Sequence, residues 1–208
     1  MIIYQVIVRY VYSGLHIFLA ASGEEDNVMQ LFQIAKEHRG TVLKFQVNQF
    51  ALALFSLMVF VFTMQNKFTM FFCGLFTMAF YWYLIYHLMW NIGGKDRIRV
   101  DGGRAKKILW KGFYIGLLAN LFNLVLAVMN LVYYYTGISW LRLGNIIARL
   151  WESMYAGWWQ LFMPHNPLAH FLVVLPTVCV AGAAYLIGYH NIFLSSFLGI
   201  KPKPAKHR

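Results

Sequence analysis

Three asparagines within an apolar stretch are the side chains whose type and spacing come closest to a functional pattern. Asn123 and Asn130 follow Asn120 at offsets of 3 and 10 residues, which bring all three to one side of a helix with ~3.6 residues per turn. Amides at such positions either hydrogen-bond to neighbouring helices or line a small polar pathway. If Arg9 faces the same bundle interior, its charge attracts anions, so the second interpretation predicts a pathway for an uncharged or anionic solute.

No set of residues points to catalysis, to a cofactor or to a metal ion. Cys73 and Cys179 fall in apolar runs and are expected to be small buried residues. His87, His170 and His190 lie near the ends of apolar runs without the HxxxH spacing of a metal site on one helix. Hydrogen-bonded histidines are expected there, with a protonation switch as the alternative. The sequence therefore predicts a protein that is not an enzyme.

Residues 91–112 form a basic segment between two apolar runs. Seven Lys and Arg residues stand there against Asp96 and Asp101, so the segment is predicted to be a solvated cytoplasmic loop and a topology signal. Its RIRV alternation also allows a short β-ribbon. Contact with anionic lipid headgroups is the alternative role, worth ~1 kcal/mol per charge near the surface. The side chains assigned to that contact are Arg97, Arg99, Arg104, Lys106 and Lys107.

The composition indicates a membrane protein. Of the 208 residues, 60% are hydrophobic and 12% are charged, whereas soluble domains have about 25% charged residues. The formal net charge of +11 raises nucleic acid as a partner. The basic residues flank apolar runs instead of forming one basic face, so the lipid bilayer is the expected partner and nucleic acid is not.

Four apolar runs predict an all-α, polytopic membrane helix bundle that forms a single domain over residues 1–208. Their approximate bounds are 47–64, 68–90, 113–135 and 168–190. The first run is already long enough for a hydrocarbon core of ~30 Å at ~1.5 Å per residue. The runs contain no Asp or Glu, which removes the usual means of coupling transport to protons or sodium.

Two further segments are amphipathic. Residues 138–163 combine Arg142, Arg149 and Gln160 with four tryptophans, which predicts a helix lying in the membrane interface. Residues 1–40 predict two amphipathic helices, the second ending near Gly40. Because a mid-span Arg9 costs ~2.5 to 3.5 kcal/mol, an interfacial helix over residues 2–20 is favoured over a fifth span.

The basic residues set the predicted orientation. The four-span arrangement places most of them at residues 36–44, 91–112 and 201–208 on one side, against Lys67, Arg142 and Arg149 on the other. By the positive-inside rule the richer side is cytoplasmic. We therefore expect a plasma membrane protein with cytoplasmic N- and C-termini.

The last quarter of the chain carries one resemblance. Its stretch AAYLIGYHNIFLSSFLGIKPK contains Tyr185, Gly188 and Tyr189 followed by a basic tail. This pattern resembles the last span of small uncharacterised multi-pass membrane proteins of Gram-positive, clostridial-type bacteria. The resemblance implies a bacterial inner membrane, and no activity follows from it.

Two functions are compatible with these observations. The first is a structural or accessory subunit of a membrane assembly, whose amphipathic segments 1–40 and 138–163 contact a protein partner or a second copy of the chain. The second is a small transporter or channel for an uncharged or anionic solute. The absence of a catalytic pattern and the two amphipathic segments favour the first.

Overall fold

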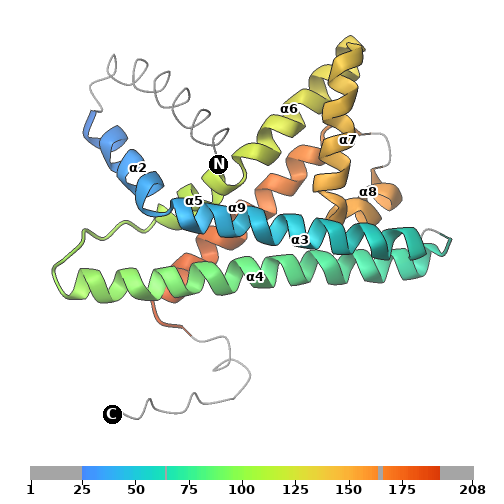
Figure 1. Cartoon of the computed structure of the whole chain (residues 1–208). Coiled ribbons are helices and arrows are strands. Elements are labelled where there is room, and N and C mark those ends of the chain that lie inside the picture. Colours follow the sequence, from blue (N-terminus) through green and yellow to red (C-terminus); the bar gives the residue numbers. More distant parts are fainter. Residues whose placement is uncertain (1–24, 64, 164–165, 193–208) are drawn as a thin grey trace. The chain divides into compact units, whose positions relative to one another are not determined.

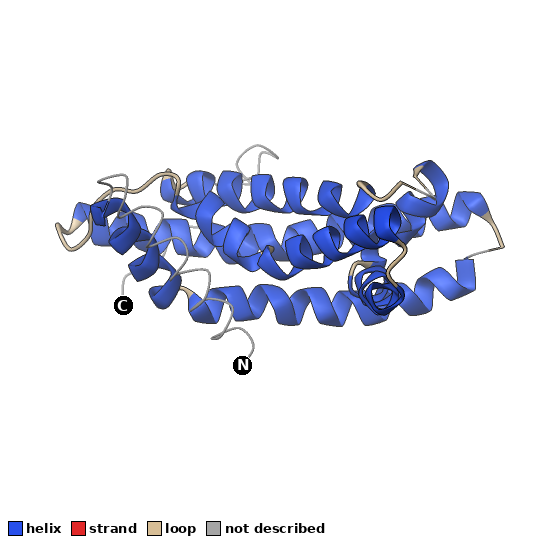
Figure 2. Cartoon of the chain, turned by 90° about the horizontal axis from the view of Figure 1, so that it is seen from above, coloured by secondary structure: helices blue, strands red, loops and turns tan. Residues whose placement is uncertain are grey.

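The computed structural model describes residues 25–63, 65–163 and 166–192, and within these ranges every regular element is a helix (Figures 1 and 2). The all-α prediction is therefore confirmed for the described residues. The chain divides into two compact units, Met1–Gly40 and Thr41–Arg208.

The first unit contains α2, Glu25–Glu37, with Lys36 in its last turn. The next helix, α3, begins at Arg39 and ends at Thr63. Gly40 therefore lies inside a helix, and the prediction that it ends one is wrong. The predicted helix over residues 2–20, including Arg9, lies outside the described residues.

A tight turn joins α3 to α4, Lys67–Asp101. Asn66 caps α4 because its side-chain oxygen accepts a hydrogen bond from the backbone N–H of Phe68 at 3.0 Å. Figure 1 shows the two helices as a long antiparallel hairpin.

The basic segment 91–112 is not a loop over its full length, because α4 continues to Asp101. Arg97 pairs with Asp101 at 3.5 Å across one helical turn, a spacing that supports a helix and not a ribbon. The backbone N–H of Gly102 then closes the helix on the carbonyl of Ile98. The loop proper is confined to residues 102–110.

The third predicted span is broken. Helix α5, Lys111–Ala119, and helix α6, Leu121–Thr136, meet at Asn120 with a bend of 52°. Helix α6 ends at Gly137, whose φ of 67° is in the left-handed region that favours glycine.

Residues 138–163 form several short elements and not one interfacial helix. They are η1 (Ser139–Leu141), α7 (Arg142–Trp151), η2 (Ser153–Tyr155) and α8 (Ala156–Phe162). Helix α7 lies beside α6, whereas η2 and α8 pack against α4 (Figure 1). The charged side chains Arg142 and Arg149 are exposed, but the turn from Glu152 to Tyr155 is buried in the bundle.

The last described helix, α9 (Ala169–Tyr189), packs most closely against α4 and α5. Glycines permit this approach: a Cβ added at Gly93 would overlap the backbone of Tyr185, and one added at Gly188 would overlap the backbone of Trp90. The small residues of α9 therefore lie at a backbone-to-backbone contact.

Among the residues that the structure describes, three helices, α3, α4 and α9, are long and apolar enough to cross a membrane. The bent pair α5 and α6 makes a fourth if it counts as one span. These helices cover the predicted spans 47–64, 68–90, 113–135 and 168–190 with different end residues. The largest difference is at the end of α4, which continues beyond residue 90 to Asp101.

Candidate functional site

Asn120 and Asn123 lie at the break between α5 and α6, and the sequence explains why the helix breaks there. The Asn120 side chain donates to the carbonyl of Gly116 at 2.8 Å, so it competes with the backbone N–H groups of its own helix. Asn123 in turn donates to the side-chain oxygen of Asn120 at 2.8 Å. Gln46 of α3 donates to the carbonyl of Ala119. The carbonyl of Ala119, next to the break, is thus satisfied by a side chain from another helix.

Gln49 of α3 connects this break to other helices. Its amide nitrogen donates to the side-chain oxygen of Asn123 at 2.8 Å. Its oxygen accepts from the Tyr81 hydroxyl at 3.3 Å. The indole N–H of Trp151 donates to Asn123 at 2.9 Å. We call Gln49, Asn120 and Asn123 the amide group; each has at most 1% of its surface exposed.

Glu152 and His170 form the second part of the site. The Oε2 atom of Glu152 lies 2.7 Å from Nδ1 of His170. The Glu152 side chain is 0% exposed and that of His170 6%. The other carboxylate oxygen, Oε1, has no hydrogen-bond partner among the described residues. We call these two residues the acid–histidine pair.

Tyr155, Thr177 and Trp82 continue the polar contacts beside this pair. The Tyr155 hydroxyl lies 3.4 Å from the Thr177 hydroxyl and accepts from the Trp82 indole at 3.2 Å. Trp151, whose indole donates to Asn123, directly precedes Glu152 in the chain, so the amide group and the acid–histidine pair are neighbours. Together, Gln49, Tyr81, Asn120, Asn123, Glu152, Tyr155, His170 and Thr177 make up the polar cluster.

Burial changes the acidity of the two groups that lie between the candidate spans. Loss of solvation raises the pKa of Glu152 from 4.5 to about 7, although the hydrogen bond and the charge interaction with His170 lower it. Loss of solvation also raises the pKa of Tyr155 to about 12. Tyr155 therefore stays protonated near neutral pH, whereas Glu152 can gain or lose a proton there.

The acid–histidine pair was missed by the sequence-based prediction. Glu152 falls within the segment 138–163 that was predicted to be an interfacial helix, and His170 was expected near the end of an apolar run. The turn at Ser153–Tyr155 ends the helical periodicity and directs Glu152 inward. The only sequence signal was a single carboxylate in a segment otherwise rich in tryptophan and aliphatic residues.

The three predicted asparagines are all buried, but they do not meet at one point. Asn130 is 3% exposed and accepts a hydrogen bond from Asn145 of α7. It lies two helical turns from Asn123, or ~10 Å at ~1.5 Å per residue. Asn130 therefore joins α6 to α7 and is not part of the polar cluster. The fourth predicted residue of this stripe, Arg9, lies outside the described residues.

A second buried ionic group lies at the other end of α4. Lys111 Nζ is 2.8 Å from Asp96 Oδ2, and the Tyr185 hydroxyl donates to the same oxygen at 3.0 Å. Both charged side chains are less than 10% exposed. This group ties α4, α5 and α9 together and explains why α4 extends so far beyond its predicted end.

The basic residues assigned to anionic lipid remain at the surface. Arg99, Arg104, Lys106 and Lys107 are exposed and Arg97 is half-buried. The predicted lipid contact requires this exposure and stays a prediction.

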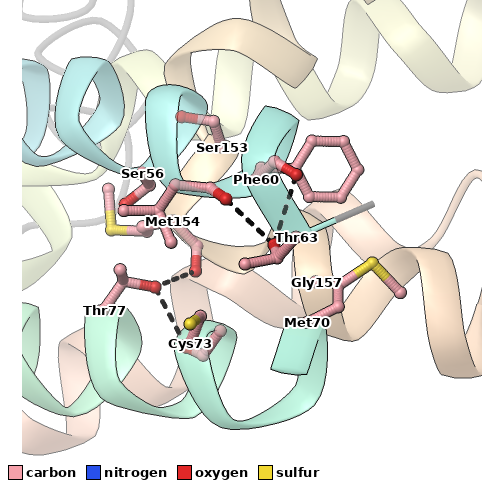
Figure 3. Close-up of a pocket in the computed structure, with 11 residues that line it drawn as sticks. Ser56, Phe60, Thr63, Met70, Cys73, Thr77, Ser153, Met154 and Gly157 are labelled. Carbon is pink, nitrogen blue, oxygen red and sulfur yellow. Dashed lines mark hydrogen bonds between the residues drawn. The ribbon is translucent and has the colours of Figure 1, made fainter. Parts of the chain in front are cut away.

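A small pocket is lined by residues of α3, α4, η2 and α8, and none of its lining residues belongs to the polar cluster (Figure 3). Ser153 and Met154, which follow Glu152, line it together with Ser56 and Thr77. The space open to the centre of a water molecule is about 10 Å³, room for about one water. The hydroxyl of Ser56 is buried there without a hydrogen-bond partner among the described residues. A larger solute does not fit unless the helices move.

Within the described part of the chain, no group of His, Cys, Asp and Glu is arranged to hold a metal ion. Cys73 and Cys179 are free thiols; Cys73 is half-buried and Cys179 is exposed, so the prediction that both are buried is wrong. Comparison with protein-family models, with curated proteins and with solved structures finds no match to this chain. The resemblance to clostridial-type membrane proteins therefore stays a prediction.

Proposed function

We propose that this chain is a small transport protein of the bacterial plasma membrane that crosses the bilayer four times with cytoplasmic ends. The four crossings are α3, α4, the bent pair α5 and α6, and α9. The basic residues of the 102–110 loop support this orientation.

The observation that carries the proposal is the polar cluster at the break of the third span. Buried polar and ionisable groups among apolar helices are costly to maintain and mark solute and ion pathways in membrane proteins. Broken helices at such sites are also typical of transporters. Here the break at Asn120 and the buried carboxylate of Glu152 belong to the same cluster.

The chemistry of the cluster favours an uncharged polar solute over an anionic one. Gln49, Asn120 and Asn123 offer neutral amide donors and acceptors. Glu152 repels anions whenever it is ionised, and no Lys or Arg side chain among the described residues forms an ion pair with it. Because the pocket lined by Ser153 and Met154 holds about one water, passage of a solute requires the helices to move apart.

Flux through liposomes tests this proposal. Vesicles containing the full chain are mixed rapidly with glycerol or urea, and the volume change is followed by light scattering. Asn123→Leu removes the centre of the amide group and is expected to bring the rate close to that of protein-free vesicles. Gln160→Leu, an exposed amide on α8, is the matched control. Rates with the native chain equal to those of empty vesicles for both solutes would contradict the proposal.

A second candidate is the accessory subunit, favoured by the separate unit Met1–Gly40 and its helix α2. This function predicts that the chain, purified gently from the cells that make it, carries a stoichiometric partner. Removal of residues 1–37 should release that partner. A lone monomer would contradict this candidate without affecting the transport proposal.

A further inference from the structure

The acid–histidine pair has the features of a site for one exchangeable proton. Glu152 faces His170 of α9, Tyr155 of η2 and Tyr81 of α4, and these are its titratable neighbours among the described residues. No Lys or Arg of the described residues forms an ion pair with it. An ionised carboxylate in this position has only the histidine to compensate its charge.

The hydrogen bonding shows where the proton can be held. Oε2 of Glu152 and Nδ1 of His170 are 2.7 Å apart, so one proton always lies between them. Oε1 has no hydrogen-bond partner among the described residues. An unpartnered oxygen is far less costly as the carbonyl of a neutral carboxylic acid than as part of a carboxylate.

We propose that Glu152 and His170 bind one exchangeable proton, and that the proton is the coupling ion of the transport proposed above. In the protonated state the acid donates from Oε2 to Nδ1, and Nε2 of the imidazole carries the second proton. On release, the proton leaves from Nε2 while the shared proton moves from Oε2 to Nδ1. The pair then holds one proton fewer and one negative charge, and no bond between heavy atoms changes.

The neighbouring hydroxyls do not compete for this role. The Tyr81 hydroxyl donates a hydrogen bond to the side-chain oxygen of Gln49. The high pKa of Tyr155 keeps its phenol neutral near pH 7. Thr177 bonds the carbonyl of Val173 within its own helix at 2.9 Å. A charge change at neutral pH is therefore confined to the acid–histidine pair. It occurs next to η2, and Ser153 and Met154 of η2 line the pocket together with residues of α4.

Infrared spectroscopy of the full chain in detergent tests the proton site without any transport assay. The native chain should show the C=O band of a neutral carboxylic acid that disappears as the pH is raised through about 7. The band should be absent in Glu152→Gln and unchanged in Asp101→Asn, which removes an exposed acid. In His170→Leu the midpoint should move to higher pH, because His170 lowers the pKa of Glu152. A band that is missing in the native chain, or that persists in Glu152→Gln, would overturn the proton site.

The coupling rests on the proposed function and needs a second measurement. In liposomes, a pH gradient that is acid outside should drive radiolabelled glycerol above its equilibrium level with the native chain, and not with Glu152→Gln. Glycerol flux that is the same with and without the pH gradient would overturn the coupling and would not contradict the transport proposal. A titrating band without flux of glycerol or urea would overturn the transport proposal and the coupling, and leave the proton site intact.

Discussion

Oε2 of Glu152 lies 2.7 Å from Nδ1 of His170, although the two residues come from different elements and are separated by 18 positions along the chain. The turn at Ser153–Tyr155 makes this contact possible, because it stops α7 and directs the carboxylate between α4 and α9. An interfacial helix over 138–163 would have left the same carboxylate in the headgroup region. Glu152, which an interfacial helix would place at the membrane surface, is therefore the most deeply buried ionisable side chain of the polar cluster.

The raised pKa of Glu152 predicts how stability depends on pH. Its value of about 7 in the fold exceeds its ordinary 4.5, so between these pH values the folded chain holds a proton that the unfolded chain has released. The stability due to this group is therefore full below pH 4.5 and is lost as the pH rises through 7. Thermal unfolding in detergent should show this loss in the native chain and much less of it in Glu152→Gln. Equal slopes in the two chains would contradict the assignment, and Asp101→Asn should keep the native slope.

Loss of the amide of Asn123 should destabilise the fold. Asn123→Leu leaves the donors of Gln49 and Trp151 without their acceptor, which costs about 1–3 kcal/mol for each unsatisfied buried group. Denaturant or thermal unfolding of the purified chain measures the change. Gln160→Leu should stay within ~0.5 kcal/mol of the native chain because its side chain is exposed. Similar values for the two variants would mean that the amide group does not hold the helices together.

The contact between α4 and α9 gives a prediction for two adjacent glycines. Gly93→Ala places a methyl group into the backbone of Tyr185, and Gly94→Ala meets its nearest atom, the carbonyl of Gly188, at 3.8 Å. The first change should cost ~1–3 kcal/mol through overpacking. The second should be neutral or slightly stabilising because alanine favours helix more than glycine. Thermal unfolding of both variants distinguishes them, and equal effects would show that the helices do not approach so closely.

The buried pair of Lys111 and Asp96 should be sensitive to removal of one partner. Lys111→Met leaves the buried Asp96 with the Tyr185 hydroxyl at 3.0 Å and the exposed Arg99 at 3.8 Å. Because Arg99 compensates part of the charge, the cost is expected at the lower end of the ~3–5 kcal/mol typical of a broken buried pair. The double variant Lys111→Met with Asp96→Leu should recover much of that stability. Lys106→Met, at an exposed position of the same loop, is the control. A loss no larger than that of the control would show that the ion pair is not formed.

The sequence predicted the helix class and the approximate places of the apolar helices because dense apolar runs leave few alternatives. It did not predict the end of α4, since the residues that extend this helix are fixed by Lys111, which lies beyond the loop. It also did not predict the break at Asn120. Asparagines at helical spacing indicate a shared face, but whether one of them ends a helix depends on partners such as Gln46 and Gln49 in another helix.

The polar cluster was predicted only in part for the same physical reason. Asn120 and Asn123 follow from periodicity within one apolar run. Glu152 and His170 are in different segments, and only tertiary packing brings them together. Asn130 has the correct periodicity but a separate partner, Asn145. Periodicity predicts which face of a helix a residue occupies, but not which residue of a neighbouring helix it contacts.

The most direct test of the transport function is the rate at which glycerol and urea enter liposomes that contain the native chain, Asn123→Leu or Gln160→Leu at equal protein content. We predict fast entry for the native chain and Gln160→Leu, and a rate near that of empty vesicles for Asn123→Leu when size-exclusion chromatography shows it to be folded. Native vesicles no faster than empty ones, or a folded Asn123→Leu as fast as the native chain, would contradict a solute pathway through the polar cluster.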